Sequence, residues 1–206
     1  MKKWIVGVFI GCWLFCICLG IGTLWAYAFS AGNGAIAQLQ LPEIEGVTRQ
    51  PGRATLILFV HPHCPCSRAS LSELSVIMAQ SQNRVNAYVL FLQPAGYMQE
   101  WVQTELWRSA VAIPGVTPLA DKDTYYARLF HAATSGQTLL YDSNGRMVFK
   151  GGITQSRGHT GDNSGRREII ALLTEGASKQ NETSVFGCPL FSNRDCKKHR
   201  GQACQL

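Results

Sequence analysis

The fold of this chain is decided at residues 56–68, which read Leu56-Ile57-Leu58-Phe59-Val60-His61-Pro62-His63-Cys64-Pro65-Cys66-Ser67-Arg68. The apolar run begins at residue 54, and its length and its Pro and Gly neighbours predict a buried strand over residues 54–60. A helical pattern begins at Ser67, so both cysteines lie at the first turn of a helix. Unpaired backbone N–H groups and the helix dipole favour a thiolate there. The stretch therefore predicts a reactive sulfur at the edge of a sheet.

The elements after this turn alternate between helices and strands. The helix expected over residues 67–80 has apolar residues at helical spacing, with Glu73 and several serines on its polar face. Because this helix joins two buried strands, we expect those strands to be parallel. Asn144-Gly145 indicates a hairpin, since the pair supplies the positive φ angles that a tight turn needs. The other predicted elements are strands at 85–92, 116–119, 138–142 and 147–150, and helices at 98–110, 121–133 and 166–173.

The N-terminus carries one long apolar segment. After Lys2-Lys3 the 26 residues from Trp4 to Phe29 are uncharged, and as a helix they span about 39 Å, enough for a hydrocarbon core of about 30 Å. The lysines precede the segment, so we expect the N-terminus in the cytoplasm and the domain in the periplasm or outside the cell. The length favours an uncleaved, single-pass signal anchor in the cell membrane. A cleaved signal peptide is the alternative, because Ala26-Tyr27-Ala28 fits a cleavage site.

The composition describes a globular protein with additional segments. The 206 residues are 46% hydrophobic and 16% charged, which suits one ordinary domain and not a disordered chain. The net charge of +6 comes from mostly scattered residues without a basic helix, so we expect no nucleic-acid partner. The predicted organisation is an anchor over 1–29, a linker over 30–53, a domain over 54–178 and a cysteine-bearing tail over 179–206.

The number of cysteines constrains the chemistry of an exported domain. Eight cysteines are present, and three of them lie inside the apolar N-terminal segment. The other five are an odd number, so in an oxidising compartment at least one thiol stays free, binds a metal or pairs with another molecule. Cys188 lies in an apolar island at residues 186–191, which could dock the tail or bring a thiol to the turn. Cys196 and Cys204 could pair with each other, or one of them with Cys188.

The two cysteines of the turn are spaced for redox chemistry. A disulfide between Cys64 and Cys66 would close a small, strained ring, and strained disulfides exchange readily. Pro65 suits the first helical position and directs Cys64 outward. We therefore predict that Cys64 attacks and Cys66 resolves, without a cofactor. An inert buried pair or a static disulfide is the structural alternative.

Two further candidate site residues lie in a polar, Gly-rich loop at residues 151–165. Arg157 or His159 could stabilise the thiolate, and His159 could transfer a proton. The alternative is a solvated loop whose Asp162 and Asn163 cap the final helix.

The order of elements, with cysteines at the end of the first strand, resembles the thioredoxin fold. Residues 58–64 and 140–146 look like the membrane-anchored TlpA and peroxiredoxin-related type. Residues 64–67, 151–154 and 157–165 are similar to a bacterial family labelled RedB. The resemblance implies an α/β domain with a central mixed sheet flanked by helices, preceded by one transmembrane helix. The chain departs from it in two ways. Ser67 stands where the family has its second cysteine, and no proline stands near Gln137, where the family has one facing the disulfide.

These observations predict a membrane-tethered, extracytoplasmic thiol–disulfide oxidoreductase that acts on protein thiols or disulfides. The first alternative is a Cu(I)-handling module similar to the Sco copper chaperones, using Cys64, Cys66 and a histidine, because Cys and His ligands suit Cu(I). His61, His63 and His159 are the candidate histidines. The second alternative is a thiol peroxidase-like reaction that passes through a sulfenic acid at Cys64.

Overall fold

The computed structural model describes residues 2–35, 38–81 and 83–191, and the chain divides into two compact units, residues 1–30 and 31–206. The first unit contains helix α1 (Lys2–Phe29). Its segment Lys3–Phe29, with a mean hydropathy of 2.5, is long and apolar enough to cross a membrane. Large apolar side chains are exposed along the whole length of α1, as in a helix that faces lipid. The expected apolar N-terminal helix is therefore confirmed.

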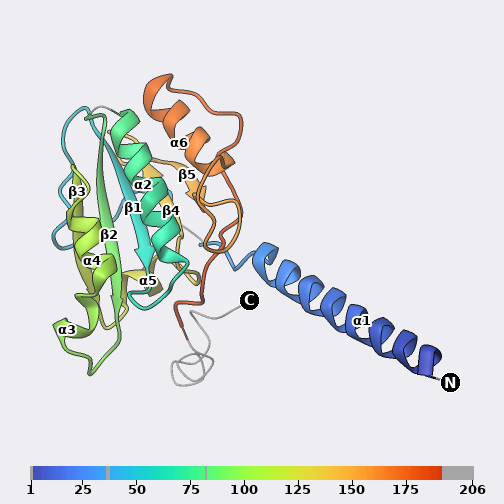
Figure 1. The fold of residues 1–206 in the computed structure, drawn as a ribbon. Coiled ribbons are helices and arrows are strands. Elements are labelled where there is room, and N and C mark those ends of the chain that lie inside the picture. The colour runs from blue at the N-terminus through green and yellow to red at the C-terminus, as the bar shows by residue number, and fades with distance from the viewer. Residues whose placement is uncertain (1, 36–37, 82, 192–206) are drawn as a thin grey trace. The chain divides into compact units, whose positions relative to one another are not determined.

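The second unit is built on a five-stranded sheet with the order β3-β2-β1-β4-β5 (Figure 1). Strand β1 pairs in parallel with β2, and β2 pairs in parallel with β3. Strand β4 pairs antiparallel with both β1 and β5. The strands are β1 (Ala54–Val60), β2 (Val85–Gln93), β3 (Val116–Lys122), β4 (Thr138–Tyr141) and β5 (Met147–Gly151). The helices are α2 (Ser67–Ser81), α3 (Gln99–Val102), α4 (Glu105–Val111), α5 (Tyr125–Leu129) and α6 (Ser164–Thr174).

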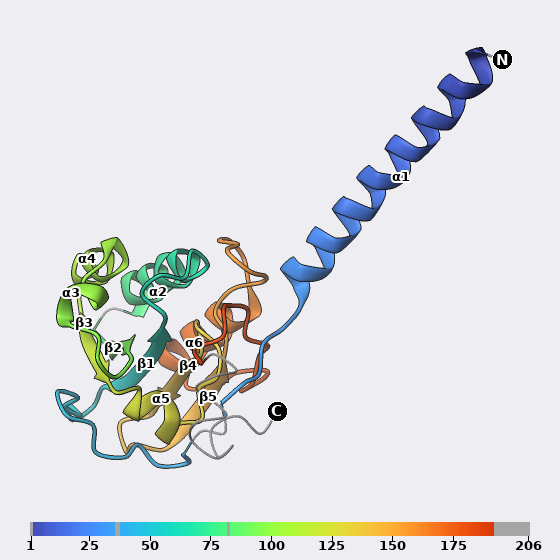
Figure 2. The same ribbon diagram turned by 90° about the horizontal axis from the view of Figure 1, so that it is seen from below.

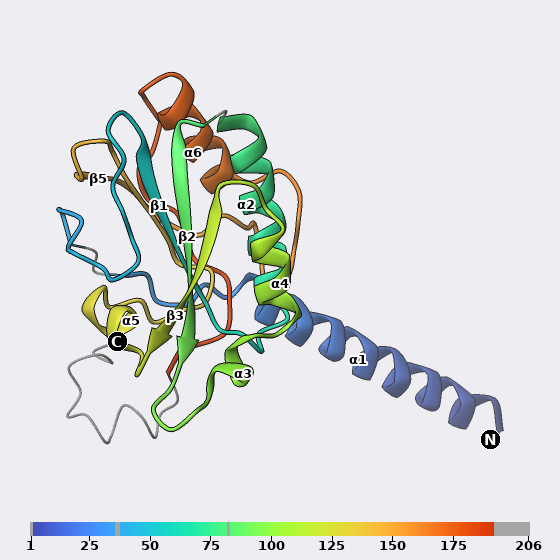
Figure 3. The same cartoon turned by 90° about the vertical axis from the view of Figure 1, so that its left-hand side faces the viewer.

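Both faces of the sheet are covered, which explains the continuous apolar run of β1. Side chains of a strand alternate between the two faces, and in β1 residues 56, 58 and 60 pack in one core cluster while residues 57 and 59 pack in another. The first cluster includes residues of α2, α4 and α6, and the second includes residues of α5. Figures 2 and 3 show α2 and α4 on one side of the sheet and α5 on the other. The mixed sheet flanked by helices is thus confirmed.

Two helices differ from their expected extents. The helix expected at 98–110 is split into α3 and α4, and between them Thr104 Oγ1 donates to the carbonyl of Pro62, in the cysteine turn, at 3.1 Å. The helix expected at 121–133 is confined to α5, because β3 continues to Lys122 and the next two residues have φ angles of 56° and 58°. A distant hydrogen bond and local backbone conformation set these boundaries, which helical periodicity does not reveal.

The hairpin of β4 and β5 is confirmed, but its turn differs from the expected one. Within residues 142–146, which the structure describes, Gly145 alone has a positive φ, at 80°. The Asp142 carboxylate accepts the backbone N–H groups of Asn144 and Arg146 at 2.9 and 2.8 Å. The Asp142 side chain therefore shapes the turn together with Gly145.

The polar face expected for α2 is correct for Ser72, which is exposed, and wrong for Glu73, because other parts of the chain cover that side chain. Glu73 is 2% exposed, and its carboxylate accepts hydrogen bonds from Gly161 N–H, from Asn163 and from Arg166. Asn163 also caps α6, accepting the Arg166 N–H at 2.8 Å as predicted. The Gly-rich loop is thus fastened to the helix that follows the cysteines.

Candidate active site

Cys64 and Cys66 lie in the turn between β1 and α2. The N–H of Cys64 donates to the His61 carbonyl at 3.1 Å, and the carbonyls of Cys64 and Cys66 accept from Ser67 and Ala69 at 3.1 Å each. The chain therefore already coils at the cysteines, before the 15 residues of α2 begin. The positive end of this helix lies at the thiols and favours their charged form.

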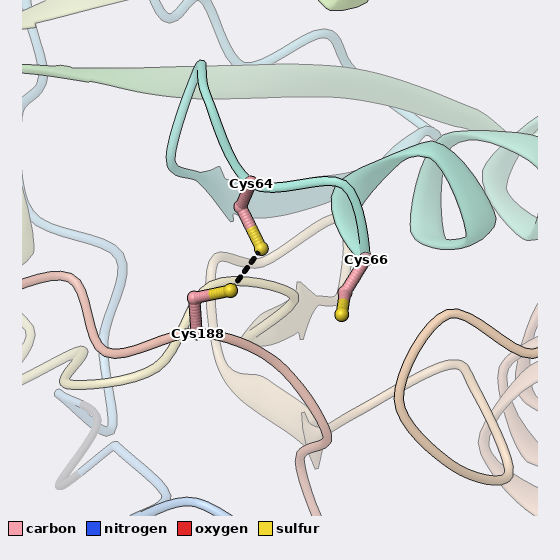
Figure 4. A group of neighbouring side chains, drawn as sticks. All are labelled: Cys64, Cys66 and Cys188. Carbon is pink, nitrogen blue, oxygen red and sulfur yellow. Dashed lines mark hydrogen bonds between the residues drawn. The ribbon is translucent and has the colours of Figure 1, made fainter. Parts of the chain in front are cut away.

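The structure brings a third cysteine to this turn. Cys188 lies in the tail segment, which we define as residues 181–191, after α6. The Sγ atoms of Cys64, Cys66 and Cys188 all lie within 4.8 Å of one another. Those of Cys64 and Cys188 are in hydrogen-bonding contact at 2.6 Å, and Figure 4 shows the two side chains pointing toward each other. The apolar island noted in the sequence thus supplies a thiol to the site.

The three thiols differ in acidity. Burial raises the pKa of Cys64, but hydrogen bonds from Cys188, Ser67 and the backbone outweigh burial, so the pKa lies below its ordinary value. Burial and the neighbouring charge of Cys64 raise the pKa of Cys66, although Arg157 opposes this rise. Burial and the same neighbour raise the pKa of Cys188 to about 12. Cys64 is therefore the most acidic of the three thiols, and the Cys188 thiol is placed to donate a hydrogen bond to its sulfur.

The outward direction expected for Cys64 is wrong. The residue is 2% exposed, and the Cys188 thiol lies directly against its sulfur. A pocket of about 280 Å³, lined in part by Pro65, Arg68 and Thr104, still reaches Cys64. A small molecule can approach along this pocket, whereas the tail segment occupies the side on which Cys188 lies.

Arg157 and His159 take different places in the loop. Arg157 donates a short hydrogen bond to the carbonyl of Gly187, the residue before Cys188, and its charge acts on Cys66. His159 is exposed, and its backbone N–H donates to the Ser156 carbonyl at 3.3 Å. The structure brings Arg157 to the cysteines and leaves His159 at the surface of the loop.

The two histidines of the turn have other partners. The N–H of His63 donates to Nδ1 of His61 at 3.1 Å, and Nε2 of His63 lies 3.0 Å from the Trp101 carbonyl. Burial and the nearby His63 lower the pKa of His61. Within residues 2–35, 38–81 and 83–191, the group with metal-ligating geometry contains three cysteines and no histidine. Cys196 and Cys204 lie outside the described residues.

Residues 133–137 lie beside the cysteine turn and hold it in place. The hydroxyl of Ser135 accepts the His61 N–H at 3.0 Å and lies 2.8 Å from the Ser67 hydroxyl. Gln137, near the position of the family's proline, accepts the Ala35 N–H at 2.8 Å through Oε1. The sequence analysis did not single out Ser135, because its contacts reach residues 74 and 68 positions away and leave no local pattern.

Comparison with known proteins finds solved structures that are similar to this chain. No family model matches the chain, and no curated protein matches it. An uncharacterized conserved protein from Geobacillus kaustophilus is similar in structure, with a TM-score of 0.57 and 19% identity over 80% of this chain and 93% of that one. A hypothetical protein from Sinorhizobium meliloti 1021 has a TM-score of 0.56 and 18% identity over 78% and 93%. A secreted disulfide oxidoreductase of Mycobacterium tuberculosis, homologous to E. coli DsbE, has a TM-score of 0.43 and 14% identity over 61% and 83%.

The chain has a thioredoxin-like fold, as the sequence predicted. Its sheet joins β1 and β2 in parallel through α2, adds the antiparallel hairpin of β4 and β5, and carries the cysteines where β1 passes into α2. Because the sequence identities are low, the similar structures bear on the fold alone, and the activity must be argued from the site itself.

Proposed function

We propose that this chain is a membrane-tethered thiol–disulfide oxidoreductase whose nucleophile is Cys64. The observation that carries the proposal is the difference in acidity within one cluster. Cys64 is ionised more easily than an ordinary cysteine, while the thiols of Cys66 and Cys188, within 4.8 Å, are ionised less easily. The thiolate is the attacking species in disulfide exchange, and a nearby thiol is needed to release the product.

The reaction uses protein thiols or disulfides as substrates and needs no cofactor. The Cys64 thiolate attacks one sulfur of a client disulfide, so that a mixed disulfide forms and the client's second sulfur leaves as a thiolate. A second cysteine of the chain then attacks Cys64 and releases the client as a dithiol. The chain is left with an internal disulfide, and the reverse sequence oxidises a client dithiol. Cys66 is the second cysteine that the sequence suggests. The positive charge of Arg157 opposes the rise in the pKa of the Cys66 thiol that burial causes, and so favours its ionised form.

The N-terminal helix supports a location at the membrane. Two lysines precede its 26 uncharged residues, and this charge asymmetry supports an N-terminus in the cytoplasm and a thioredoxin-like domain in the periplasm or outside the cell. An oxidising compartment is also where disulfide exchange has clients. We propose that α1 stays uncleaved and keeps the domain near membrane-bound partners.

The test is reduction of a disulfide-linked peptide by the purified full chain in detergent, with dithiothreitol as the electron donor. We expect Cys64→Ser to reduce turnover to the uncatalysed level, because serine is not ionised at neutral pH. Cys12→Ser, in the membrane helix, is the matched control and should keep full activity. Full turnover by the Cys64→Ser variant would refute the proposal.

A second function is favoured by one observation, the grouping of three sulfurs. A three-coordinate ion with metal–sulfur bonds of about 2.3 Å needs sulfurs about 4 Å apart. The three Sγ atoms lie within 4.8 Å of one another, and those of Cys64 and Cys188, now 2.6 Å apart, would separate to hold the ion. Thiolates suit Cu(I), so the domain could carry this ion as cargo. The ligands would be Cys64, Cys66 and Cys188, without the histidine that the Sco-like alternative requires.

Titration of the reduced full chain with Cu(I), against a chromogenic chelator, tests this second function. We expect Cys66→Ser and Cys188→Ser to weaken binding to a similar extent, and His159→Ala to leave it unchanged. Binding that depends on His159 and not on Cys188 would contradict the three-sulfur site.

A further inference from the structure

The tail segment pairs with the domain as an added strand would. The N–H of Ser135 donates to the Cys188 carbonyl at 2.8 Å, and the N–H of Leu190 donates to the Ala133 carbonyl at 2.8 Å. Thr134 and Pro189 form an antiparallel bridge between these bonds. The bonds use main-chain atoms only, so another extended peptide in the same direction can make them.

Side chains fix the register of this pairing. Val185 is 1% exposed and Leu190 is 5% exposed, so the segment is anchored on both sides of Cys188. Gly187 lies so close to the domain that a Cβ atom there would collide with the carbonyl oxygen of Ser135. This register sets the Cys188 sulfur 2.6 Å from that of Cys64. The segment therefore lies as a cysteine-containing peptide would lie when bound for attack by Cys64.

We infer that the tail segment occupies the surface on which a client's cysteine peptide binds, and that Cys188, rather than Cys66, is the thiol that releases the client from Cys64. The inference rests on the proposed function and identifies its partner as an extended peptide with a cysteine opposite Ser135. A client peptide and the tail segment exclude each other, because both need the main-chain groups of residues 133–135. The tail leaves when a client binds, and it returns to these main-chain groups while the client is held only by its disulfide bond to Cys64, which lets Cys188 complete the reaction.

Each step of this cycle is balanced. The Cys64 thiolate attacks the client disulfide, the Cys64–client bond forms, and the client's S–S bond breaks to give one client thiolate. Cys188 then loses its proton and attacks Cys64, which forms the Cys64–Cys188 disulfide and releases the client's second sulfur, to which the proton passes. The client gains two electrons and the two cysteines lose them. A dithiol reductant restores Cys64 and Cys188.

Digestion with trypsin identifies the resolving cysteine, because it separates Cys64 and Cys188 into different peptides. Cleavage separates a peptide of residues 54–68, which contains Cys64 and Cys66, from one of residues 180–194, which contains Cys188 alone among the cysteines. The reduced full chain in detergent is exposed to glutathione disulfide as the probe, alkylated at its remaining thiols and digested without reduction. We expect the peptides 54–68 and 180–194 to be disulfide-linked. Cys66→Ser should retain this link and Cys64→Ser should lose it.

The lifetime of the mixed disulfide gives the second readout. In Cys188→Ser we expect glutathione to remain on Cys64 roughly 100-fold longer than in the unaltered chain, because an intramolecular step has been lost. In Cys66→Ser the lifetime should be unchanged. A disulfide within residues 54–68 of the unaltered chain, or clearance at the ordinary rate in Cys188→Ser, would overturn the inference.

The inference and the proposed function can fail separately. The double variant Cys66→Ser/Cys188→Ser retains Cys64 alone in the cluster, and the proposed function requires it to form a stable glutathione adduct there. If the adduct forms and only the role of Cys188 is contradicted, the oxidoreductase proposal stands without the tail. If no adduct forms at Cys64, both are wrong.

Discussion

The cysteine turn and the tail segment meet at one cluster of sulfurs, but they are built from different kinds of contact. The turn is local, since its hydrogen bonds join Cys64 to His61 and Cys66 to Ala69. The tail segment is held by residues far away in the sequence, and Cys188 touches Cys64 across 124 positions. Local contacts thus coil the chain at the nucleophile, whereas long-range contacts hold the turn against residues 133–137, lower the pKa of Cys64 further and limit which molecules reach it.

The largest expected effect concerns a long-range contact of the helix that begins at the turn. The side chain of Glu73, 3% exposed, pairs at 2.6 Å with that of Arg166, 19% exposed, and so ties α2 to the Gly-rich loop. Removing one partner of a buried ion pair leaves an uncompensated charge and costs about 3 kcal/mol. Glu73→Gln should therefore lower the free energy of unfolding by about that amount, measured by denaturation of the full chain in detergent and followed by circular dichroism.

Glu105→Gln is the matched control, because it breaks an ion pair at the surface. Glu105 and Arg68 are 3.4 Å apart, with exposed fractions of 72% and 66%. Exposed pairs contribute about 0–1 kcal/mol, so this variant should unfold at nearly the same point as the unaltered chain. Equal losses in the two variants would mean that the loop is not fastened through Glu73.

A smaller effect is expected where the tail segment meets the domain. Gly187→Ala places a Cβ against the Ser135 carbonyl, and the tail should separate from residues 133–135. Hydrogen exchange at the N–H groups of Ser135 and Leu190 should then speed up about tenfold, because their acceptors lie on the opposite segment. The N–H groups of Ser67 and Ala69, in the turn, should exchange at their former rates.

Gly34→Ala serves as the control for this substitution. A Cβ at Gly34 would meet only Gln137 Oε1, at an ordinary contact distance of 3.9 Å. In Gly34→Ala, the exchange rates at the N–H groups of Ser67, Ala69, Ser135 and Leu190 should match those of the unaltered chain. If the N–H groups of Ser135 and Leu190 exchange as slowly in Gly187→Ala as in Gly34→Ala, the close approach at Gly187 does not hold the tail segment in place.

The same distinction explains how much the sequence could predict. The strand ending at Val60, the helix starting at Ser67 and the hairpin at Gly145 follow from local patterns, and the structure has all three. The burial of Glu73 could not be predicted, because its partners lie 88 to 93 residues away. For Cys188 a partial signal is present in the sequence, an apolar island around a cysteine in a polar tail. Nothing local showed that this island pairs with residues 133–135.

The smallest expected effect is on the acidity of Cys64. Burial raises the pKa of this thiol, and hydrogen bonds led by that from Cys188 lower it further than burial raises it. Cys188→Ala removes the donor, so the pKa of Cys64 should rise, and with a hydrogen bond of about 1 kcal/mol the thiolate fraction at pH 7 should fall about fivefold. The measurement is the rate of alkylation by iodoacetamide against pH, read at Cys64 by mass spectrometry.

The midpoint of this pH profile reports the pKa of Cys64. Greater exposure of the sulfur would raise the alkylation rate by the same factor at every pH and would leave the midpoint unchanged. Cys188→Ser retains a hydroxyl donor and should leave the midpoint closer to that of the unaltered chain than Cys188→Ala does. Because the lowered pKa stabilises the fold through the thiolate, that contribution is present above the ordinary pKa and is lost as the pH falls through the lowered one. Coinciding midpoints in the alanine variant and the unaltered chain would show that the turn alone sets the acidity of Cys64, without the tail.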